Sequence, residues 1–575
     1  MVNMLTNAIK YLNLAVVIGF LFSNINAMDK LPSNAQKDIY LDSFFSKFKK
    51  VVSPESIEKE ILIFSEAYNL YIENYLKPVN LEDKKALFTK ANKLLDVIER
   101  KNKELLEGKE VKEIEASDLI DIEAQKEEEI KTVKKNKKKQ EFYKKLNSGE
   151  TMELIMDYVF NDIDAHTSWL KPETAKKFLE QLQGRHKGIG ILFSSNKEEN
   201  YLDIKKVFAD GGASKAGLLP GDKIYYVDNK RVDIGENFEN VEAIVSSIRG
   251  EAGTKVNLGI KRKDIATNKD KDINLMVLRG DYYIPSVEYK IIDKKYAYIQ
   301  IFSFNHDTSD LYLKALRATN INNLQGLIID LRDNPGGLLQ QAVIVGDSLL
   351  SGEEVVSVKG RDEYRDKVYR SLPRSVVNEN IPVIILLNGQ SASASELLSA
   401  GFALNNRAII IGDYSFGKWS VQTPFTLSNK SMFNITTQLF YGPFGNTFQG
   451  SGISPDIAIL PNRYFKGKSA DLTEETIALE RKKEFREMNY SNWLKVDNIN
   501  AMNRKPKGIT NEYNCPKYED KDYILGCALI YLKHKNINTF FNITNKIEEK
   551  RLKLDIKDPK DLEVKIKAII AEVNP

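Results

Sequence analysis

Two short apolar strands, each followed at once by a turn of glycine and polar residues, constrain the fold of this 575-residue chain most strongly. The first, residues 381–388, precedes a serine-rich turn and a helical run to about Leu404. The second, residues 407–412, precedes a loop that carries Lys418. Further strands and helices alternate between about residues 280 and 465, a pattern that predicts an α/β sheet. Because functional groups gather at the carboxyl ends of such strands, Ser393 and Lys418 are expected to meet there.

The first part of the chain predicts an export signal and helices. Lys10 precedes an apolar run from Leu12 to Phe22, which is typical of a secretory signal over residues 1–27. The run is shorter than the ~20 residues of a membrane-spanning helix, so membrane contact is expected only through an uncleaved signal. Residues 28–184 are predicted to be a helical N-terminal domain with a charged helix or linker at 126–145. The expected compartment is the periplasm or an equivalent extracytoplasmic space.

A change in the sequence pattern from about Arg185 predicts a separate β domain. Glycine turns and short strands alternate over residues 185–265, with a helix near residues 240–249. The order of the glycine loop at 188–191, the turn at 217–222 and the closing helix resembles a PDZ domain. That resemblance implies a groove that takes a C-terminal peptide, because glycine-loop N–H groups bind carboxylates and an edge strand accepts an extended chain. The candidate peptide-binding residues are Gly188, Ile189, Gly190, Ile191, Val241, Ile244 and Val245, and plain core packing is an equal alternative for each.

Lysine can act as a general base for a serine hydroxyl only as a neutral amine. Its ordinary pKa of about 10.4 must therefore fall toward neutrality, and burial has that effect because it disfavours the ammonium form. Tyr414, Phe416 and Trp419 flank Lys418 and offer an apolar environment. A helix that begins next to Ser393 also points its positive end at the developing oxyanion.

Five motifs in order, over about residues 150 to 460, make the chain resemble the carboxyl-terminal processing proteases, also called tail-specific proteases. They are Asp164-Ala-His-Thr-Ser-Trp-Leu170, Leu331-Arg-Asp-Asn-Pro-Gly-Gly337, Ser391-Ala-Ser-Ala-Ser-Glu396, Phe416-Gly-Lys418 and Gln449-Gly-Ser-Gly-Ile-Ser-Pro-Asp456. The resemblance implies Ser393 as nucleophile, Lys418 as general base and Gln422 as the residue that orients the amine. It implies an oxyanion hole built from backbone N–H groups of Ala394, Gly336 and Gly337.

One departure bears on the mechanism. Many members of the family carry an acidic residue eleven positions after the nucleophile, where this chain has Leu404. The sequence therefore favours a Ser-Lys-Gln arrangement, with Glu396 and Ser415 as secondary positioning candidates. Ser391 and Ser395 are rival nucleophiles. The four histidines could in principle serve a Ser-His triad, but none lies in a suitable turn.

The complete expectation is a multidomain protein of α/β, β and helical parts. An α/β serine-protease core (266–465) would carry an inserted PDZ domain and helical N- and C-terminal regions, the latter over 466–575. The expected function is an exported serine endopeptidase that forms an acyl-enzyme and acts on proteins or peptides with apolar C-termini, with an adaptor protein as a further candidate partner. The alternatives are a non-catalytic peptide-binding scaffold or chaperone, and a Ser-Lys esterase or amidase.

The remaining composition adds two predictions. The net charge of +4, with 84 basic and 80 acidic residues, gives no argument for nucleic-acid binding, and no phosphate loop or ligand cluster implies a cofactor or metal. The two cysteines, Cys515 and Cys527, are expected to form a disulfide in an exported protein, with two buried thiols as the alternative.

Overall fold

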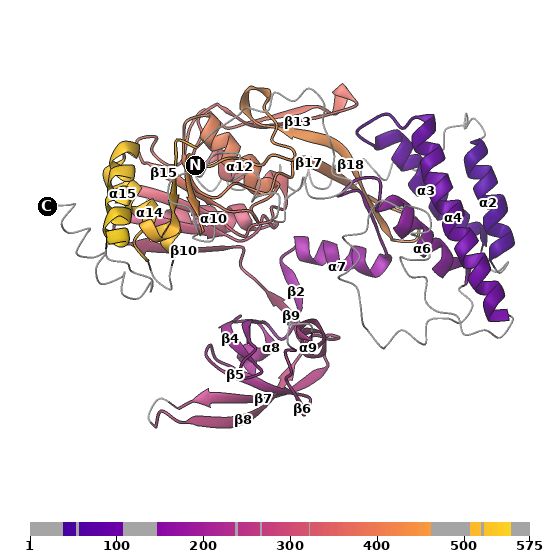
Figure 1. Cartoon of the computed structure of the whole chain (residues 1–575), viewed down its shortest axis with the longest axis horizontal. Coiled ribbons are helices and arrows are strands. Elements are labelled where there is room, and N and C mark those ends of the chain that lie inside the picture. The colour runs from indigo at the N-terminus through magenta and orange to yellow at the C-terminus, as the bar shows by residue number, and fades with distance from the viewer. Residues whose placement is uncertain are drawn as a thin grey trace, which may run out of the picture. The chain divides into compact units, whose positions relative to one another are not determined.

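The computed structural model describes residues 38–553 except 53–56, 107–146, 236–239, 265–266, 321–322, 462–505 and 519–521. The predicted signal (1–27) and the charged segment 126–145 therefore lie outside the described residues. The chain divides into two compact units, residues 1–65 with 79–159 and residues 66–78 with 160–575. Figure 1 shows the elements of both units. Within the described part, no helix combines the length and apolar character needed to cross a bilayer.

The first unit is helical, as the sequence predicts. It contains α2 (Ile39–Val51), the first half of α3 (Ile57–Asn74), α4 (Leu81–Leu106) and α6 (Ser148–Phe160). Asp38 caps α2 by accepting hydrogen bonds from the N–H groups of Tyr40 and Leu41. The helices pack through aromatic rings, with Phe44 at 4.8 Å from Phe64 and 5.8 Å from Phe88 between centroids.

The second unit is built around a seven-stranded sheet of order β10-β11-β12-β15-β16-β19-β20. Its strands are β10 (Val287–Ile292), β11 (Tyr296–Ile301), β12 (Gly326–Asp330), β15 (Val383–Leu387), β16 (Ile409–Gly412), β19 (Ile457–Leu460) and β20 (Gly508–Asn511). Only the β10–β11 pair is antiparallel. β12 and β15 are buried at every position, as the strands of a parallel sheet covered on both faces are.

Helices cover both faces of this sheet. α10 (Thr308–Ala318), α11 (Leu339–Asp347) and α12 (Ala394–Leu404) contribute to one apolar cluster, which includes Leu316, Val345 and Leu398. α14 (Tyr523–His534) and α15 (Ile537–Lys553) contribute to a second cluster on the alternate side chains of the same strands, Ile328 and Ile384 among them. The sheet is therefore the central layer that fixes the positions of the loops at its carboxyl edge (Figure 1).

A second, five-stranded sheet supports the loop that carries Lys418. Its order is β1-β18-β13-β14, and β17 also pairs with β18. The strands are β1 (Ser168–Leu170), β13 (Glu354–Gly360), β14 (Lys367–Arg370), β17 (Ser420–Thr426) and β18 (Met432–Tyr441). All of these pairs are antiparallel.

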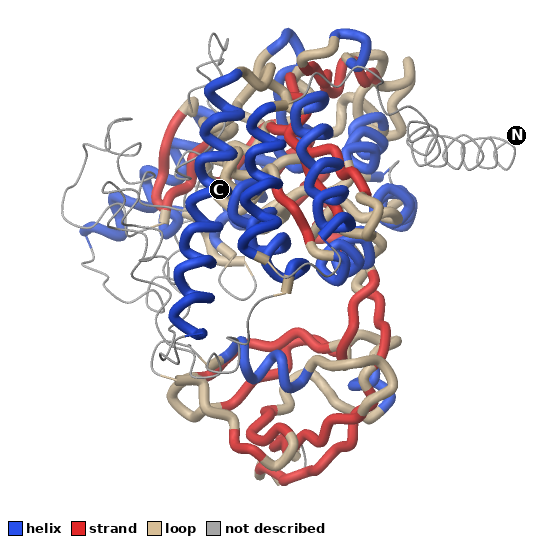
Figure 2. The backbone as a smooth tube through the Cα atoms, turned by 90° about the vertical axis from the view of Figure 1, so that its right-hand side faces the viewer, coloured by secondary structure: helices blue, strands red, loops and turns tan. Residues whose placement is uncertain are grey.

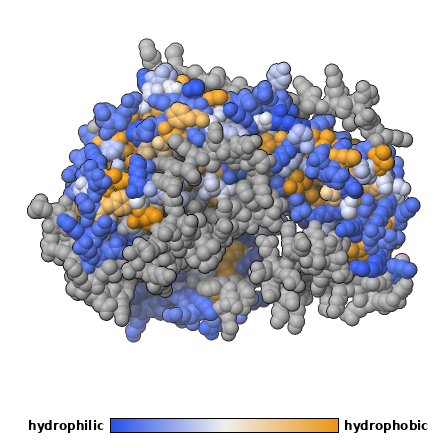
Figure 3. Space-filling view, turned by 45° about the horizontal axis from the view of Figure 1, so that its top comes forward, coloured by the Kyte–Doolittle hydropathy of each residue, from blue (hydrophilic) through white to orange (hydrophobic). Residues whose placement is uncertain are grey.

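Residues 191–278 form a small β domain, whose strands are red in Figure 2. Its sheet has the order β3-β4-β5-β7-β8 with β6 beside β5, and a short ribbon of β2 and β9 precedes and follows it. The strands are β2 (Arg185–Gly188), β3 (Ile191–Asn196), β4 (Tyr201–Val207), β5 (Lys223–Val227), β6 (Lys230–Arg231), β7 (Lys255–Lys263), β8 (Asp270–Leu278) and β9 (Gly280–Tyr283). The helices are α8 (Gly212–Lys215) and α9 (Val241–Ile248). Figure 3 shows mostly hydrophilic residues over the described surface of one face of the molecule.

Two sequence-based boundaries need correction. The β domain was expected to end at residue 265, but β8 pairs with β7 along its whole length and extends the domain to Leu278. The C-terminal region was expected to be helical from residue 466, but residues 508–511 form β20 at the edge of the central sheet. β20 has only four residues and gives no apolar run, whereas β8 begins with three charged residues and is continuously apolar only from Leu275.

Candidate active site

Ser393 lies at the sharp turn between β15 and α12. Its backbone has φ 54° and ψ −117°, a region that non-glycine residues rarely adopt and that is held only where the surroundings enforce it. The turn follows a buried strand and ends in the first residue of α12, Ala394. This strained strand-to-helix geometry presents a serine side chain at the edge of a sheet, as in nucleophile elbows.

The structure distinguishes the three serines of this turn. Ser391 and Ser395 are fully buried, and their hydroxyls donate hydrogen bonds to the carbonyls of Leu331 at 2.8 Å and Asn334 at 3.0 Å. Ser393 is only half-buried. The flanking serines therefore fasten the turn to the loop that follows β12, while Ser393 remains accessible to a substrate.

The glycine turn at residues 336–337 lies directly against Ser393. A Cβ placed on Gly336 would lie 2.8 Å from Ser393 Cβ and 2.9 Å from the Ala394 nitrogen, and both glycines have positive φ, 99° and 138°. The Gly336 N–H, however, donates to Asn334 Oδ1 at 2.8 Å, so it is already occupied. The oxyanion role of Gly336 stays a prediction, and it would require this N–H to leave Asn334. Among the described residues, the N–H groups of Ala394 and Gly337 have no acceptor, and they are the remaining candidates.

Glu396 links the serine turn to the lysine loop. Its carboxylate is fully buried and accepts hydrogen bonds from the N–H groups of Ser393 (2.9 Å), Gly417 (2.7 Å) and Lys418 (2.9 Å), and from the Ser415 hydroxyl. Burial raises the pKa of Glu396 to about 7, although these four donors oppose the shift. The carboxylate therefore spans the two segments that carry the candidate nucleophile and base.

Lys418 and Gln422 form a direct pair. The Lys418 Nζ donates to Gln422 Oε1 at 2.6 Å. Among the described residues, no hydrogen bond joins the Lys418 amine to the Ser393 hydroxyl. Phe416 and Trp419 are buried on either side of Lys418, and Tyr414 is half-buried, so the loop is anchored by apolar side chains.

A β-bulge between Val421 and Gln422 aims the Gln422 side chain. The pairing of β17 with β18 shifts by one residue there, which places Gln422 opposite Thr436. The Gln422 Nε2 donates to Ser420 Oγ at 2.9 Å and to Thr436 Oγ1 at 3.1 Å. The amide is thus held at both ends, with its oxygen toward the lysine.

The turn at residues 449–453 packs under the lysine loop. Gly450 N–H donates to the Gly417 carbonyl at 2.8 Å, and Gln449 Oε1 accepts from the Trp419 N–H at 2.7 Å. A Cβ on Gly452 would lie 2.3 Å from the Ser415 carbonyl oxygen. The glycines of this motif therefore permit the close approach of two backbone segments.

The candidate peptide-binding residues lie in the small β domain or in the segment, residues 188–190, that leads into it. Gly188 and Gly190 have φ 152° and 80°, and β3, which begins at Ile191, is an edge strand. Val241, Ile244 and Val245 on α9 are half-buried, as Ile191 is. Ile189 differs from them, because it is 3% exposed and belongs to the domain core.

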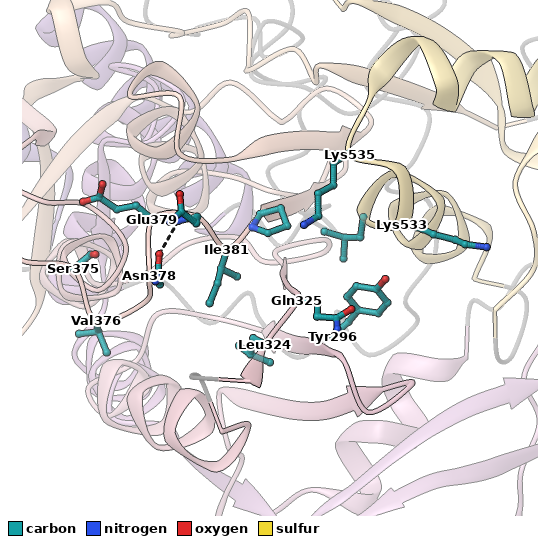
Figure 4. Close-up of a pocket in the computed structure, with 13 residues that line it drawn as sticks. Tyr296, Leu324, Gln325, Ser375, Val376, Asn378, Glu379, Ile381, Lys533 and Lys535 are labelled. Carbon is teal, nitrogen blue, oxygen red and sulfur yellow. Dashed lines mark hydrogen bonds between the residues drawn. The ribbon is translucent and has the colours of Figure 1, made fainter.

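A cleft of about 910 Å³ lies at the opposite edge of the central sheet (Figure 4). It is lined by Tyr296, Gln325 and Pro382, which stand at the amino ends of β11, β12 and β15, together with Lys535 after α14. None of the candidate catalytic residues lines it, and Ser393 follows the carboxyl end of β15. The cleft is therefore separate from the site described above.

Several residues that organise the site were not predicted from the sequence. Asn334 occupies the Gly336 N–H, Thr436 holds Gln422, and Asp522 forms an ion pair with Arg332 at 2.7 Å. Asn334 lies within the motif Leu331–Gly337, so the sequence did mark its segment. Thr436 and Asp522 lie outside every motif. Cys515 and Cys527, which were expected to pair, are joined by a disulfide.

Comparison with known proteins shows what this chain is similar to. Residues 295–459 match peptidase family S41. A carboxy-terminal-processing protease of Bartonella bacilliformis is 34% identical over 322 residues, which cover 55% of this chain and 71% of the relative. A probable CtpA-like serine protease of Staphylococcus haemolyticus is 30% identical over 325 residues, 56% of this chain and 63% of the relative. The chain thus spans about two thirds of the length of these relatives.

Solved structures also align with the chain. A photosystem II D1 C-terminal processing protease is 20% identical, covering 70% of this chain and 93% of that chain with a TM-score of 0.39. The PDZ domain of a carboxy-terminal protease from Vibrio cholerae is 23% identical, covering 17% of this chain and 99% of that chain with a TM-score of 0.15.

Proposed function

Because the chain belongs to the family of carboxy-terminal-processing proteases, we propose that it is a serine endopeptidase in which Ser393 is the nucleophile, Lys418 the general base and Gln422 the residue that orients the amine. One observation carries the assignment. Ser393 is the half-buried serine in a strained turn, and the buried Glu396 carboxylate fastens that turn to the backbone of Lys418.

The proposed reaction begins when the neutral Lys418 amine takes the proton of the Ser393 hydroxyl. The oxygen attacks the peptide carbonyl, and the N–H groups of Ala394 and Gly337 stabilise the oxyanion. The Lys418 ammonium then gives its proton to the departing amine, which leaves an acyl-enzyme on Ser393. Water, deprotonated by Lys418, hydrolyses this ester and restores the serine. Gln422 holds the amine throughout through the 2.6 Å hydrogen bond.

A Ser393→Ala variant tests the nucleophile. We expect it to lose turnover of a peptide with an apolar C-terminus by a factor of 10⁴ or more, on the order reported for triad nucleophiles. Ser399→Ala is the matched control, because Ser399 lies in the same helix and only bonds back to the Ser395 carbonyl at 2.7 Å. Cleavage that persists in Ser393→Ala would remove the assignment and favour a different nucleophile. A folded wild-type chain that binds peptides without cleaving them would favour the scaffold alternative.

We further propose that the β domain of residues 191–278 is a PDZ-like domain that binds the C-terminal tail of the substrate. Support comes from the edge strand β3, the positive-φ glycines 188 and 190, and the half-buried apolar residues of α9. An extended tail would add a strand to β3 and place its last side chain against Ile244 and Val245. Ile189 is left out of this groove because its side chain lies in the core.

Matched substrates and variants test tail recognition. A peptide with a free C-terminal carboxylate should be cleaved with a lower KM than its C-terminal amide. Val245→Lys should raise KM for the free acid, whereas Ala243→Lys, on an exposed position of the same helix, should not. Equal KM values for acid and amide would remove the tail-binding proposal and leave the Ser393 assignment standing. Hydrolysis of small esters in preference to peptides would favour the esterase alternative.

Export completes the proposal. The disulfide between Cys515 and Cys527 supports an oxidising compartment, because such bonds persist outside the cytoplasm. The signal predicted at residues 1–27 would direct the chain there. Fractionation of the expressing cells tests this, and a cytoplasmic protein with reduced cysteines would contradict it.

A further inference from the structure

A chain of hydrogen bonds runs from Asp164 to the catalytic amine. Asp164 is 3% exposed, and its Oδ1 accepts from the Thr436 hydroxyl at 3.2 Å. Thr436 Oγ1 accepts from Gln422 Nε2 at 3.1 Å, and Gln422 Oε1 accepts from Lys418 Nζ at 2.6 Å. Four side chains from the segment before β1 and from β17, β18 and the lysine loop are thereby connected.

The series of hydrogen bonds has a fixed direction because its first residue, Asp164, can only accept. An ionised carboxylate has no proton to donate, so the Thr436 hydroxyl is the donor in its 3.2 Å contact with Asp164. Thr436 Oγ1 also lies 3.2 Å from Thr167 Oγ1, but the single Thr167 proton is used in the shorter bond to Asp164 Oδ2 at 2.7 Å. With its own proton used, the Thr436 oxygen can only accept from Gln422, which requires the amide nitrogen to face it. The amide oxygen must then face Lys418. The order of donors and acceptors at Asp164 thus determines which end of Gln422 meets the amine.

Thr167 fixes Asp164 in turn. The second carboxylate oxygen accepts from Thr167 Oγ1 at 2.7 Å, and the first also accepts from the N–H groups of His166 and Thr167, both at 2.8 Å. Thr167 Oγ1 accepts from the Thr436 N–H at 3.1 Å, which ties the segment to β18. The motif Asp164-x-His-Thr167 therefore has a defined physical task at the candidate active site.

We propose that Asp164 and Thr436 are positioning residues that set the orientation of the Gln422 amide and, through it, the proton affinity of Lys418. This inference rests on the proposed Ser393–Lys418 mechanism and deepens it. A carbonyl oxygen facing the amine favours the ammonium over the neutral form, while an amide N–H facing it does the opposite. Release of the amide would therefore misplace the lysine lone pair and lower the apparent pKa of the base.

The test compares pH–rate profiles of Thr436→Val and wild type. Valine keeps the shape of threonine and removes the acceptor for Gln422 Nε2. We expect kcat to fall by on the order of tenfold, because the amine loses its fixed orientation. The acid limb of the kcat profile should move to lower pH by about one unit, because that shift corresponds to about the free energy of one hydrogen bond to a charged group. Thr436→Ser, which keeps the hydroxyl, should restore both properties.

The matched control is Thr437→Val on the same strand. Thr437 pairs with the Thr423 hydroxyl at 2.7 Å, across the same two strands but apart from the Gln422 chain. Its loss removes a comparable interstrand hydrogen bond, so it should leave the acid limb unchanged. Glu396 contacts the Lys418 backbone and has a pKa of about 7. Because it is present in every variant, its titration contributes equally to all of the pH–rate profiles compared.

Asp164→Asn is the second variant, for the case in which Thr436→Val does not fold. Asparagine keeps the size and one acceptor but lets the Thr436 proton turn toward Gln422, so the acid limb should move in the same direction. A profile that superimposes on wild type in a folded Asp164→Asn or Thr436→Val enzyme would overturn the proposal. Activity that survives Ser393→Ala would instead refute the underlying mechanism, so the two failures are distinct.

Discussion

The nucleophile side and the base side of the candidate active site are held by different means. Ser393 and the Gly336–Gly337 turn follow parallel strands that are buried at every position, and their support is mainly backbone geometry. Lys418 and Gln422 belong to an antiparallel ribbon, and their support is a series of side-chain hydrogen bonds. Glu396 is the one side chain described that contacts the backbone of both Ser393 and Lys418.

This difference determines which kinetic properties a substitution on each side can change. Backbone support leaves a nucleophile in one place, because the strained turn and the close glycine contacts permit no alternative. Side-chain support fixes a direction as well as a place, because an amide or hydroxyl can reverse without moving its neighbours. Changes on the nucleophile side should therefore alter the rate, while changes on the base side should alter both the rate and its pH dependence.

Among the residues that support the site without reacting, the largest effect is expected at Glu396, which bridges the two sides. Glu396→Gln replaces one acceptor oxygen by a donor and leaves two of the four donors at the carboxylate without a partner. We expect kcat to fall by about 10²-fold, because the serine turn and the lysine loop lose their common anchor, a misplacement of the kind that costs this much. Single-turnover assays on a tail peptide measure it. A loss of less than threefold would mean that the two sides are aligned independently.

The same variant reports the titration of Glu396. The folded-state pKa of about 7 lies above the ordinary value of 4.5, so the folded chain binds the proton more tightly than the unfolded chain. Its contribution is fully present below about pH 4.5 and is lost as pH rises through 7, a change of roughly 3 kcal/mol. Denaturant unfolding of wild type should show this decline relative to Glu396→Gln. Parallel curves from pH 4.5 to 8 would contradict the shifted titration.

A smaller effect is expected from Asp522, which supports the nucleophile side. Arg332, next to the glycine turn, bonds to the fully buried Asp330 and also to Asp522 at 2.7 Å. Burial alone would raise the pKa of Asp522, but the hydrogen bonds and charge of Arg332 lower it. Asp522→Asn keeps the cap on Leu525 N–H and removes the charge. We expect kcat to fall about fivefold as the turn before Gly336 loosens.

The acid limb of the kcat profile of Asp522→Asn should stay where it is in wild type. The control is Asp362→Asn, which breaks the exposed pair with Arg365 and should change nothing measurable. An acid limb displaced by Asp522→Asn would show that the two sides are not separable.

The nucleophile side was also the easier one to predict from sequence. Apolar strands followed by glycine turns are local signals, so β12, β15 and the turns after them could be predicted from a dozen neighbouring residues each. The roles of Ser393 and Gly337 were implied by the family resemblance and stay predictions. What the sequence could not show was the use of the Gly336 N–H by Asn334, because hydrogen-bond partners depend on side-chain direction. The role of Gly336 as an oxyanion donor therefore stays a prediction that needs this N–H to be released from Asn334.

Prediction of the base side would have required contacts between residues that lie far apart in the sequence. Thr436 lies 272 residues from Asp164 and in no motif, and its pairing with Gln422 depends on a one-residue bulge. The same limit applied to β20, whose four residues give no periodic pattern but complete the edge of the central sheet. Domain edges were therefore misplaced where a strand was short or began with charged residues, whereas the central α/β alternation was confirmed.

The smallest effect on activity is expected from the disulfide. Cys515 and Cys527 are fully buried and join the segment before α14 to α14 itself, behind the central sheet. A Cys515→Ala/Cys527→Ala variant should unfold at lower denaturant, with a loss of roughly 3 kcal/mol at most for so short a loop. Its kcat at 25 °C should stay within about twofold of wild type, because the backbone of the serine turn rests on strands that remain buried. Dithiothreitol should reproduce this in wild type and leave the double variant unaffected. Reduction that abolished activity in the folded enzyme would show that the Cys515–Cys527 disulfide, which closes the loop containing Asp522, helps to hold the nucleophile in place. The position of Ser393 would then depend on this covalent bond as well as on the parallel sheet.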